Sequence, residues 1–319
     1  MARTPQTWQK RAAEVEAQFR RAFKTASARL NLSWSNWGFG REPLRQSLAR
    51  LQKAGIGFVE LHGNRYAPDL GYDAAETASL LDGFGIRAAG ICGMFGHEND
   101  LSSTSAVSRQ NAMDYIRRQL DLAAALGCTY LLVVPGECGR TRPYDAYDFE
   151  RSADTLRRVG DAFVASGVRA AIEPIRADEV SFCHTFADAV RYIEAVGHPG
   201  VQHINGDLYH MLHHEDDPAT TILTHGKRMV NLHMADTNRG ALGTGVYDLD
   251  AIIAALYAVG YNNADCFCTC EPLGPGGDVY RAMHGVTPPE QLDTLVTATA
   301  RYWRQREDQV RSMAADKGE

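Results

Sequence analysis

The chain has 319 residues, 45% of them hydrophobic and 23% charged, and its formal net charge is −6. This size and apolar content are enough for a buried core without structural disulfides, and the acidic balance argues against a nucleic-acid partner, which would need a concentrated basic face. The sequence has no run of about 20 apolar residues, so neither a membrane-spanning helix nor a membrane partner is expected. Residues 1–21 are charged and lack the apolar centre of a signal peptide.

The cysteine content favours reduced thiols. Seven cysteines are an odd number, and they show no small-domain spacing, so we expect a cytoplasmic protein. Cys266, Cys268 and Cys270 alternate along one predicted strand and share a face of it, while Glu271 lies on the other face. We expect these three thiols to be packed in the core and not to bind a metal.

The predicted elements alternate along the chain. An amphipathic helix comes first, over Trp8–Phe23, with Thr7 as its N-cap. Short apolar runs then alternate with longer amphipathic ones, which is typical of βα units. The predicted strands are Leu30–Trp34, Phe58–Leu61, Ala88–Cys92, Tyr130–Val134, Ala170–Glu173, Val201–Asp207, Met229–His233 and Cys266–Glu271. The predicted helices that follow them are Pro43–Ala54, Ala74–Phe84, Arg109–Leu126, Asp148–Ser166, Phe186–Val196, Ala219–His225, Asp250–Val259 and Pro289–Arg306.

Eight strands in strict alternation with eight helices predict the α/β class, as a closed (β/α)8 TIM barrel with an extra N-terminal helix. An open doubly wound sheet is the competing interpretation, but no G-x-G-x-x-G follows an early strand. We divide the chain into a helical arm (1–27), the barrel (28–308) and a polar tail (309–319) with a frayed end. The arm is expected to pack across the amino-terminal end of the barrel or against another subunit.

Each of the last four predicted strands ends in a potential metal ligand. These residues are Glu173, Asp207, His233 and Glu271. In a barrel of this kind the carboxyl ends of the strands form the active site, and three carboxylates meeting there would repel unless a cation or protons neutralised them. We therefore predict one divalent metal ion. The oxygen-rich set suits Mn²⁺ as first choice, with Co²⁺ or Mg²⁺ as alternatives.

Two asparagines lie two residues before predicted ligands. Asn205 precedes Asp207, and Asn231 precedes His233, so alternation places both inside the barrel one layer below the metal. They could orient the ligands, or they could simply hydrogen-bond within the barrel. The sequence leaves these alternatives open.

The spacing around the predicted ligands resembles a known family. Glu173 is followed by Glu179, Asp207 by His210, His233 by Arg239, and Glu271-Pro272 by Gly276-Gly277. On these motifs the chain resembles the sugar isomerase/epimerase superfamily of barrels, and in particular the ketose 3-epimerases of D-tagatose and D-psicose type. The resemblance covers roughly residues 30–306.

This resemblance implies an enzyme of carbohydrate metabolism that removes the proton next to a keto-sugar carbonyl. The metal would hold the carbonyl and a neighbouring hydroxyl oxygen, while Glu173 and Glu271 act as catalytic acid and base from opposite faces. Glu179, His210 and Arg239 would bind substrate hydroxyls. The chemistry is reasonable, because a metal stabilises a developing enolate by several kcal/mol and a positioned carboxylate contributes roughly 10²–10⁴-fold.

The whole chain looks most like the large subunit of bacterial C-glycoside deglycosidases. The stretches Asn31–Gly38 and Asn231–Gly240 carry this resemblance. It implies a metal-dependent carbon–carbon lyase that cleaves 3-keto C-glucosides by enolisation and β-elimination, with a small β-rich partner subunit. A ketose 3-epimerase or related sugar isomerase is the alternative.

An eliminating enzyme needs an acid to protonate the departing aromatic ring. His184 is our first choice for this catalytic role and His62, a substrate-binding candidate, is the second. Trp34 and Trp37 stand near the end of the first predicted strand, where they would suit a flat aglycone or would simply pack the barrel mouth. We assign Trp34 to substrate binding.

Other classes of protein remain open. A binding module or inactive barrel would have the same fold, although the presence of all four ligand types argues against it. A barrel DNA-repair endonuclease would need further ligands and a basic groove, which the charge balance disfavours. We also expect an oligomer.

Overall fold

The structure is a computed structural model, and it describes residues 7–23, 28–63, 71–273 and 287–315. Eight parallel strands close into a barrel in the order β1 to β8, which confirms the predicted (β/α)8 fold. The strands are β1 (Asn31–Ser35), β2 (Phe58–Gly63), β3 (Arg87–Gly93), β4 (Tyr130–Val133), β5 (Arg169–Ile172), β6 (His203–Asp207), β7 (Met229–Met234) and β8 (Phe267–Cys270). Gly276, Gly277 and the last four residues of the predicted tail lie outside the described ranges.

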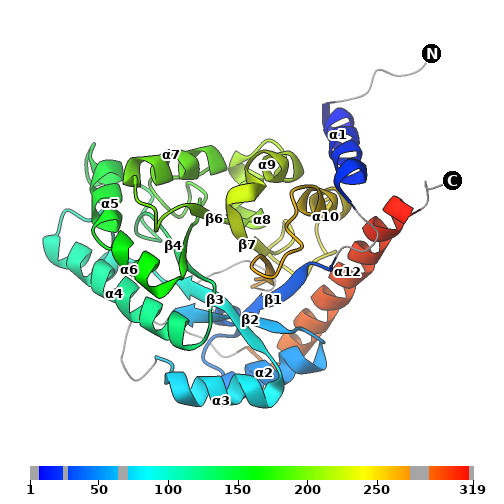
Figure 1. Cartoon of the computed structure of the whole chain (residues 1–319), viewed down its shortest axis with the longest axis horizontal. Helices are drawn as coiled ribbons and strands as arrows, with labels where there is room; N and C mark the ends of the chain where they lie inside the picture. Colours follow the sequence, from blue (N-terminus) through cyan, green and yellow to red (C-terminus); the bar gives the residue numbers. More distant parts are fainter. Residues whose placement is uncertain (1–6, 24–27, 64–70, 274–286, 316–319) are drawn as a thin grey trace.

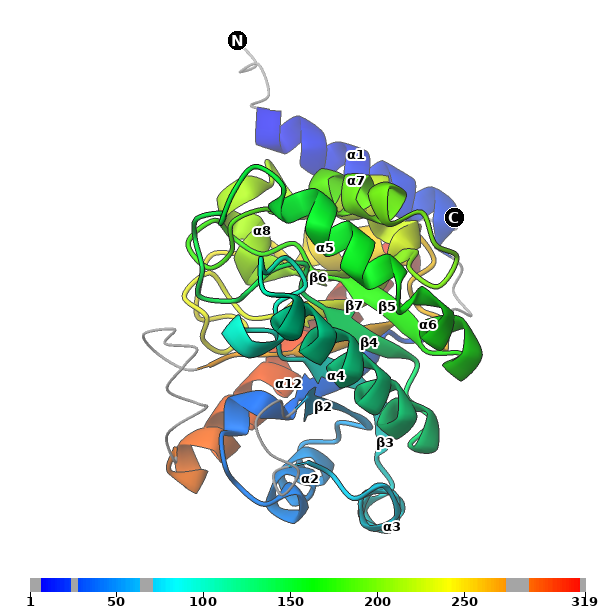
Figure 2. The same cartoon turned by 90° about the vertical axis from the view of Figure 1, so that its left-hand side faces the viewer.

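Helices surround the strands, as Figure 1 shows, and Figure 2 shows several of them over one side of the barrel. They are α1 (Thr7–Ala22), α2 (Leu44–Lys53), α3 (Ala74–Phe84), α4 (Ala106–Ala125), α5 (Asp148–Arg157), α6 (Gly160–Ser166), α7 (Phe186–Val196), α8 (Leu208–His214), α9 (Pro218–His225), α10 (Leu249–Ala258) and α12 (Pro289–Ala315). Buried apolar side chains of strands and helices form one continuous core. A smaller cluster, including Tyr130 and Phe267, lies where the strands begin. Among the described residues, no helix is long and apolar enough to cross a membrane.

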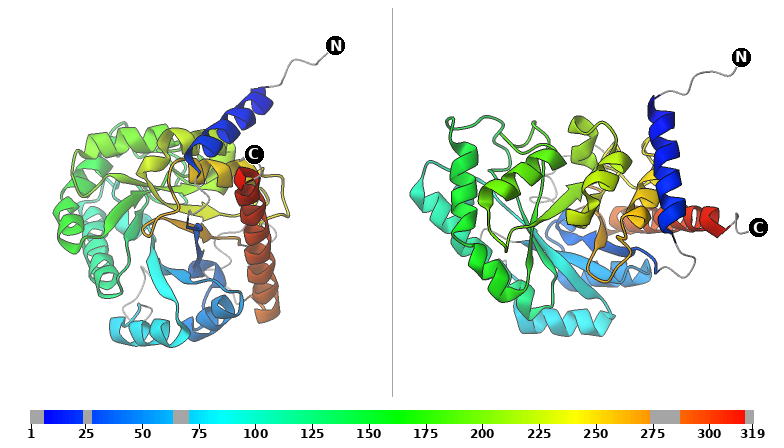
Figure 3. Two further views of the ribbon diagram at one scale, coloured as in Figure 1. Left: turned by 45° about the vertical axis from the view of Figure 1, so that its right-hand side comes forward. Right: turned by 45° about the horizontal axis from the view of Figure 1, so that its top comes forward.

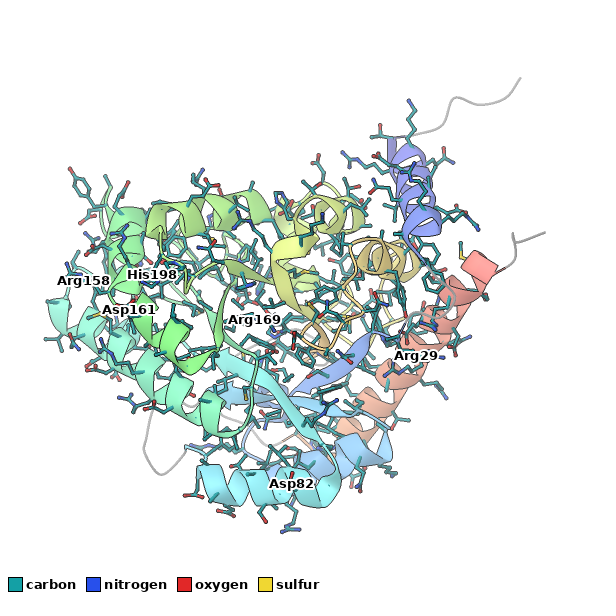
Figure 4. All side chains as sticks on the ribbon, in the orientation of Figure 1. Arg29, Asp82, Arg158, Asp161, Arg169 and His198 are labelled. Carbon is teal, nitrogen blue, oxygen red and sulfur yellow. The ribbon has the colours of Figure 1, made fainter. Side chains whose placement is uncertain are left out.

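The single helix predicted over residues 148–166 is wrong in one respect, because the chain forms two helices there, α5 and α6. Gly160 begins α6 where the ring of His198 comes very close: a Cβ atom on this glycine would lie 2.4 Å from the ring. His198 also faces Asp161 at 3.2 Å, and Figure 4 shows the two side chains at the outer edge of the barrel. The chain therefore divides into α5 and α6 at the point where the start of α6 packs against His198, in the segment before β6. Helix α8 was not predicted.

Helix α12 continues to Ala315, beyond the predicted end at Arg306. Trp303 and Val310, seven residues apart, are both buried, so they occupy the same face of the helix. The prediction of a polar tail from residue 309 is therefore wrong for residues 309–315, which belong to a packed helix.

The N-terminal arm forms α1 as predicted, but α1 lies along the outer helical layer beside α10 and α9 and not across the amino-terminal end of the barrel (Figure 3). Val15 and Phe19 are buried, and the rings of Phe19 and Phe23 contact Tyr257 of α10. This apolar face anchors α1 to the barrel.

Candidate active site

The four predicted metal ligands meet at the carboxyl end of the barrel. Asp207 and His233 are paired neighbours at the ends of β6 and β7. Glu173 and Glu271 each follow the last residue of a strand, and their backbone N–H groups donate to the preceding strand, to Val133 O at 3.1 Å and Met234 O at 2.8 Å. Parallel strands thus bring together residues that are almost 100 positions apart.

The side chains of these four residues are close to one another and buried. His233 Nδ1 lies 3.3 Å from Glu173 Oε1 and 3.4 Å from Glu271 Oε1. A ligand atom of Asp207 lies within 4.8 Å of one from Glu173 and of one from His210. All four predicted ligands are at most 6% exposed. Three buried carboxylates around one imidazole fit a divalent cation, because without one their charges would have to be neutralised by protons.

Glu60 on β2 is a site residue that the sequence analysis missed. Its side chain is fully buried, and both carboxylate oxygens lie 3.0 Å from His233 Nε2. It also accepts hydrogen bonds from Tyr130 at 2.7 Å and Asn231 at 3.2 Å. The available signal was a lone charged residue inside an apolar strand, since such a group is rarely buried without partners.

The contact between Glu60 and His233 determines which ring nitrogen of His233 faces the proposed metal centre. Burial alone would raise the pKa of Glu60, but the charge of His233 and the hydrogen bonds hold it below its ordinary value. Burial opposes protonation of His233, yet the carboxylates of Glu271 and Glu60 raise its pKa well above the usual value. A metal ligand must offer an unprotonated nitrogen. With Nε2–H donating to Glu60, Nδ1 is the atom that faces Glu173 and Glu271 and can bind an ion.

The carboxylates themselves respond to burial in different ways. Burial raises the pKa of Glu271 to about 8, and the nearby charges of Asp207 and Glu173 act in the same direction. For Asp207 burial is outweighed by the positive charges of His210, His233 and Arg239, which lower its pKa. A divalent cation among these groups would stabilise the ionised form of both.

The two asparagines differ in what they contact. Asn205 donates to Glu173 Oε1 at 2.8 Å, so it orients a predicted ligand. Asn231 donates to Asn205 at 2.7 Å and to Glu60, and it accepts from Thr269 at 2.6 Å. Asn205 therefore fits the ligand-orienting alternative directly, whereas Asn231 acts through the hydrogen-bond network beneath the site.

A pocket lies over this centre, and it encloses about 660 Å³ when the part open to solvent is included. Glu173 and Glu271 line it together with Glu179, His210 and Arg239, so the structure brings these five predicted residues to one cavity. The remaining lining residues are Trp37, Cys92, Gly93, Met94, Phe95, Val134, Cys138 and Ile175. The pocket therefore combines a charged side with an apolar one.

Arg239 reaches the pocket from an ordered loop after β7. Its backbone has φ 56°, which is unusual for a residue with a side chain. Its N–H donates to Asp236 O at 2.7 Å, and the Asp236 carboxylate accepts from Gly243 N at 2.7 Å. The guanidinium stacks 4.6 Å over the ring of Tyr209 and lies 3.5 Å from Glu179 Oε1. The hydrogen bonds of this loop therefore stabilise an unfavourable backbone conformation at Arg239, and this conformation places the guanidinium at the pocket.

The assignment of Trp34 to substrate binding is wrong. Trp34 is 1% exposed and stacks on Phe39 at 5.7 Å, so it is a core residue. The neighbouring Ser35 interacts with Glu60 inside the barrel, and alternation along β1 sends Trp34 outward. Trp37, in the short 3-10 helix η1 (Asn36–Phe39), lines the pocket instead, and its indole N–H donates to Glu271 Oε1.

Neither candidate acid, His184 nor His62, is among the described residues that line the pocket. His184 Nδ1 lies 2.8 Å from Ile175 O, and its ring stacks on His214 at 5.2 Å. His62 follows Glu60 by two residues on β2, and its backbone N–H donates to Asn36 at 2.8 Å. The geometry therefore gives no support for His184 as an acid at the pocket.

The predicted core thiols are confirmed. All seven cysteines lie in the described part of the chain, and none of them forms a disulfide. Cys266, Cys268 and Cys270 are buried in the main apolar core, on the face of β8 opposite Thr269 and Glu271. They belong to none of the groups of closely spaced ligand atoms in the described chain.

The fold and the site together define an α/β barrel with a buried carboxylate–imidazole centre at its carboxyl end. A family model described as "Xylose isomerase-like TIM barrel" matches residues 48–291. The chain belongs to this family.

Several proteins that are similar to this chain are sugar epimerases. A ketose 3-epimerase from Arthrobacter globiformis is 26% identical over 231 residues, which are 72% of this chain and 78% of the relative. The solved structure of an L-ribulose 3-epimerase has a TM-score of 0.78 at 20% identity and covers 91% of this chain and 99% of its own. That of a 3-keto-D-glucoside 4-epimerase from E. coli has a TM-score of 0.68 at 22% identity, with 84% and 100% covered. The two solved structures show the same fold, and the similarity to the ketose 3-epimerase supports a sugar epimerase or isomerase. None of the three supports the carbon–carbon lyase that the sequence analysis preferred.

Proposed function

We propose that the protein is a divalent-metal-dependent ketose 3-epimerase. The main support is the position of two carboxylates, Glu173 and Glu271, which line the same pocket and lie 3.3 Å and 3.4 Å from His233 Nδ1. Similarity to a ketose 3-epimerase over 72% of the chain supports the same reaction. The C-glycoside deglycosidase interpretation lacks comparable support, because neither of its two candidate acids, His184 and His62, lines the pocket.

In this proposal the two carboxylates work in turn on one carbon. One of them removes the proton next to the ketone, and the other returns a proton from the opposite face, which inverts the centre. The Trp37 indole N–H donates to Glu271 and so fixes the orientation of that carboxylate. Asn205 does the same for Glu173. Both carboxylates are thus held in place before substrate arrives, which favours catalysis.

The metal would be held by Glu173, Asp207, His233 and Glu271. When bound, it supplies a positive charge that stabilises the negative charge developing on the substrate oxygen. Mn²⁺ is our first choice, because carboxylate-rich sets with open positions suit it. Chelation should abolish activity, and Mn²⁺ or Co²⁺ should restore it. Full activity in protein shown by elemental analysis to be metal-free would contradict the proposal.

Glu179, His210 and Arg239 would bind the hydroxyl groups of the sugar. All three line the pocket, and Arg239 lies 3.5 Å from Glu179, so donors and acceptors alternate along this side. A polyhydroxylated chain needs both kinds of group to satisfy its hydroxyls. A keto-sugar is therefore the proposed substrate. The oligomer and the small partner subunit stay sequence-based predictions.

The decisive experiment compares two substrates in deuterated water. Metal-loaded protein is incubated with a panel of free ketoses (D-fructose, D-tagatose and L-ribulose) and, separately, with a 3-keto C-glucoside, and products are followed by NMR. We expect the C3 epimer of at least one ketose, with deuterium at C3, and no aglycone release. Release of aglycone without any epimerisation would favour the lyase and reject the epimerase.

A further inference from the structure

Cys92 lies inside the barrel beside the proposed metal centre. It belongs to β3, is 6% exposed and lines the pocket. One ligand atom each from Cys92, Glu60, His233 and Glu271 lie within 4.8 Å of one another. A second such group consists of Glu173, Asp207 and His210 and shares no residue with the first. The proposed four-ligand centre takes members from both groups, whereas Cys92 stands next to it with no role in the proposed reaction.

A sulfur atom in this position changes which ions the site can hold. Thiolate is a soft ligand that favours zinc-like ions, whereas Mg²⁺ and Mn²⁺ favour carboxylate oxygen. Zinc accepts four ligands in a tetrahedron drawn from cysteine, histidine and carboxylate, and neighbouring ligand atoms then lie roughly 3.3–3.8 Å apart. Ligand atoms already within 4.8 Å of one another need only short side-chain movements to reach that geometry.

We propose that Cys92 gives the barrel a second, thiolate-containing coordination mode, in which Zn²⁺ or Cd²⁺ binds through Cys92, His233, Glu271 and Glu60. The thiol proton is released to solvent as the sulfur–metal bond forms, and no group is oxidised or reduced. This mode goes beyond the proposed epimerase activity and would place the ion on the side of the site formed by β2 and β3.

The two coordination modes exclude each other. His233 and Glu271 belong to both sets, so an ion held through Cys92 removes two of the four ligands from the activating ion. It also engages Glu60, which otherwise holds His233 Nε2 at 3.0 Å. Thiophilic ions should therefore compete with Mn²⁺ for the same protein and act as inhibitors.

The chain offers a matched control for this proposal. Cys138 also lines the pocket, but it belongs to neither group of closely spaced ligand atoms. Replacing either cysteine by serine changes one atom of the side chain. The two variants therefore differ only in whether the lost sulfur stands beside His233 and Glu271.

The test is a titration of the metal-free protein with Cd²⁺, followed by the ultraviolet charge-transfer absorption of the cadmium–thiolate bond. We expect the wild type and Cys138→Ser to develop this band, saturating at one ion per chain, and Cys92→Ser to lack it. A large excess of Mn²⁺ should lower the band in the wild type. Circular dichroism checks the fold, and Cys92→Ala provides a second variant that removes the sulfur.

Three outcomes would overturn the proposal: no band in the wild type, a band that survives both Cys92 substitutions, or loss of the band in Cys138→Ser. The measurement uses no substrate. Its failure is therefore distinguishable from failure of the proposed epimerase activity, which the ketose incubations test separately.

Discussion

The two halves of the barrel mouth present different kinds of side chain. Strands β5 to β8 and their loops contribute the charged residues, including Glu173, Glu271 and Arg239. Strands β1, β3 and β4 and the segments after them contribute mainly apolar residues, such as Met94 and Val134. The charged half carries the groups proposed to bind an ion and to transfer a proton, whereas the apolar half lines the space above them.

Glu60 departs from this division, and the departure is informative. It comes from β2, in the otherwise apolar half, but it is fully buried and points beneath the metal centre, where it contacts His233 across the barrel. The charged half therefore depends on the apolar half for the orientation of its imidazole. The following predictions test this dependence and the division itself.

The largest effect is expected from the charged half. Glu271→Gln and Glu173→Gln should each lower ketose epimerisation by roughly 10²–10⁴-fold or more, because each removes a proton-transfer group and a metal ligand. The assay is chiral chromatography of the products with deuterium incorporation at C3. Glu14→Gln, on the exposed face of α1, is the control. Near-normal turnover in either pocket variant would show that another group acts as the base.

The next effect concerns the contact across the barrel. Glu60→Gln should weaken metal binding about 10–100-fold, because the neutral amide holds the His233 Nε2–H less strongly and no longer fixes which nitrogen faces the ion. Equilibrium dialysis of the metal-free protein measures this without substrate. Tyr130→Phe, which removes one of the donors to Glu60, should have a smaller effect. Equal affinities in the wild type and Glu60→Gln would contradict the role given to Glu60.

The two tryptophans after β1 should separate function from stability. Trp37→Phe removes the indole donor to Glu271, so this carboxylate is no longer held in one orientation for proton transfer, although water in the pocket can replace the lost donor. We expect a lower kcat, by about 5–100-fold, with little change in melting temperature. Trp34→Phe should instead lower the unfolding free energy by roughly 1–3 kcal/mol and leave kcat nearly unchanged. The reverse pattern would restore Trp34 as the pocket residue.

The smallest effect is expected from the apolar wall. Met94 is half-buried and lines the pocket, so Met94→Ala should change KM for different ketoses by roughly threefold to tenfold and leave C3 exchange intact. Val107→Ala, an exposed apolar residue on α4, serves as control. Loss of exchange in Met94→Ala would mean that this wall takes part in the chemistry and does not only shape the pocket.

The sequence by itself determined the order of the elements and the positions of the four proposed metal ligands along the strands. Period-two and helical patterns located all eight strands to within two residues at either end, because each pattern reflects local geometry and burial of one face. The proposed ligands Glu173, Asp207, His233 and Glu271 could be located for the same reason: strand ends are local features, and closure of a parallel barrel brings them together. Glu179, His210 and Arg239 lie within six residues of those strand ends, so they too could be located from the sequence.

Only the tertiary structure decided contacts between residues far apart in the chain. Glu60 and His233 are 173 positions apart, and no spacing rule links them. Trp34 and Trp37 differ by three positions, yet only a 3-10 turn after β1 determines that Trp37 enters the pocket. The docking of α1 on α10 depends in the same way on the shape of a distant surface. Local periodicity determines which secondary-structure element forms and which of its faces is buried. Which side chains meet across the barrel depends instead on the packing of the whole fold.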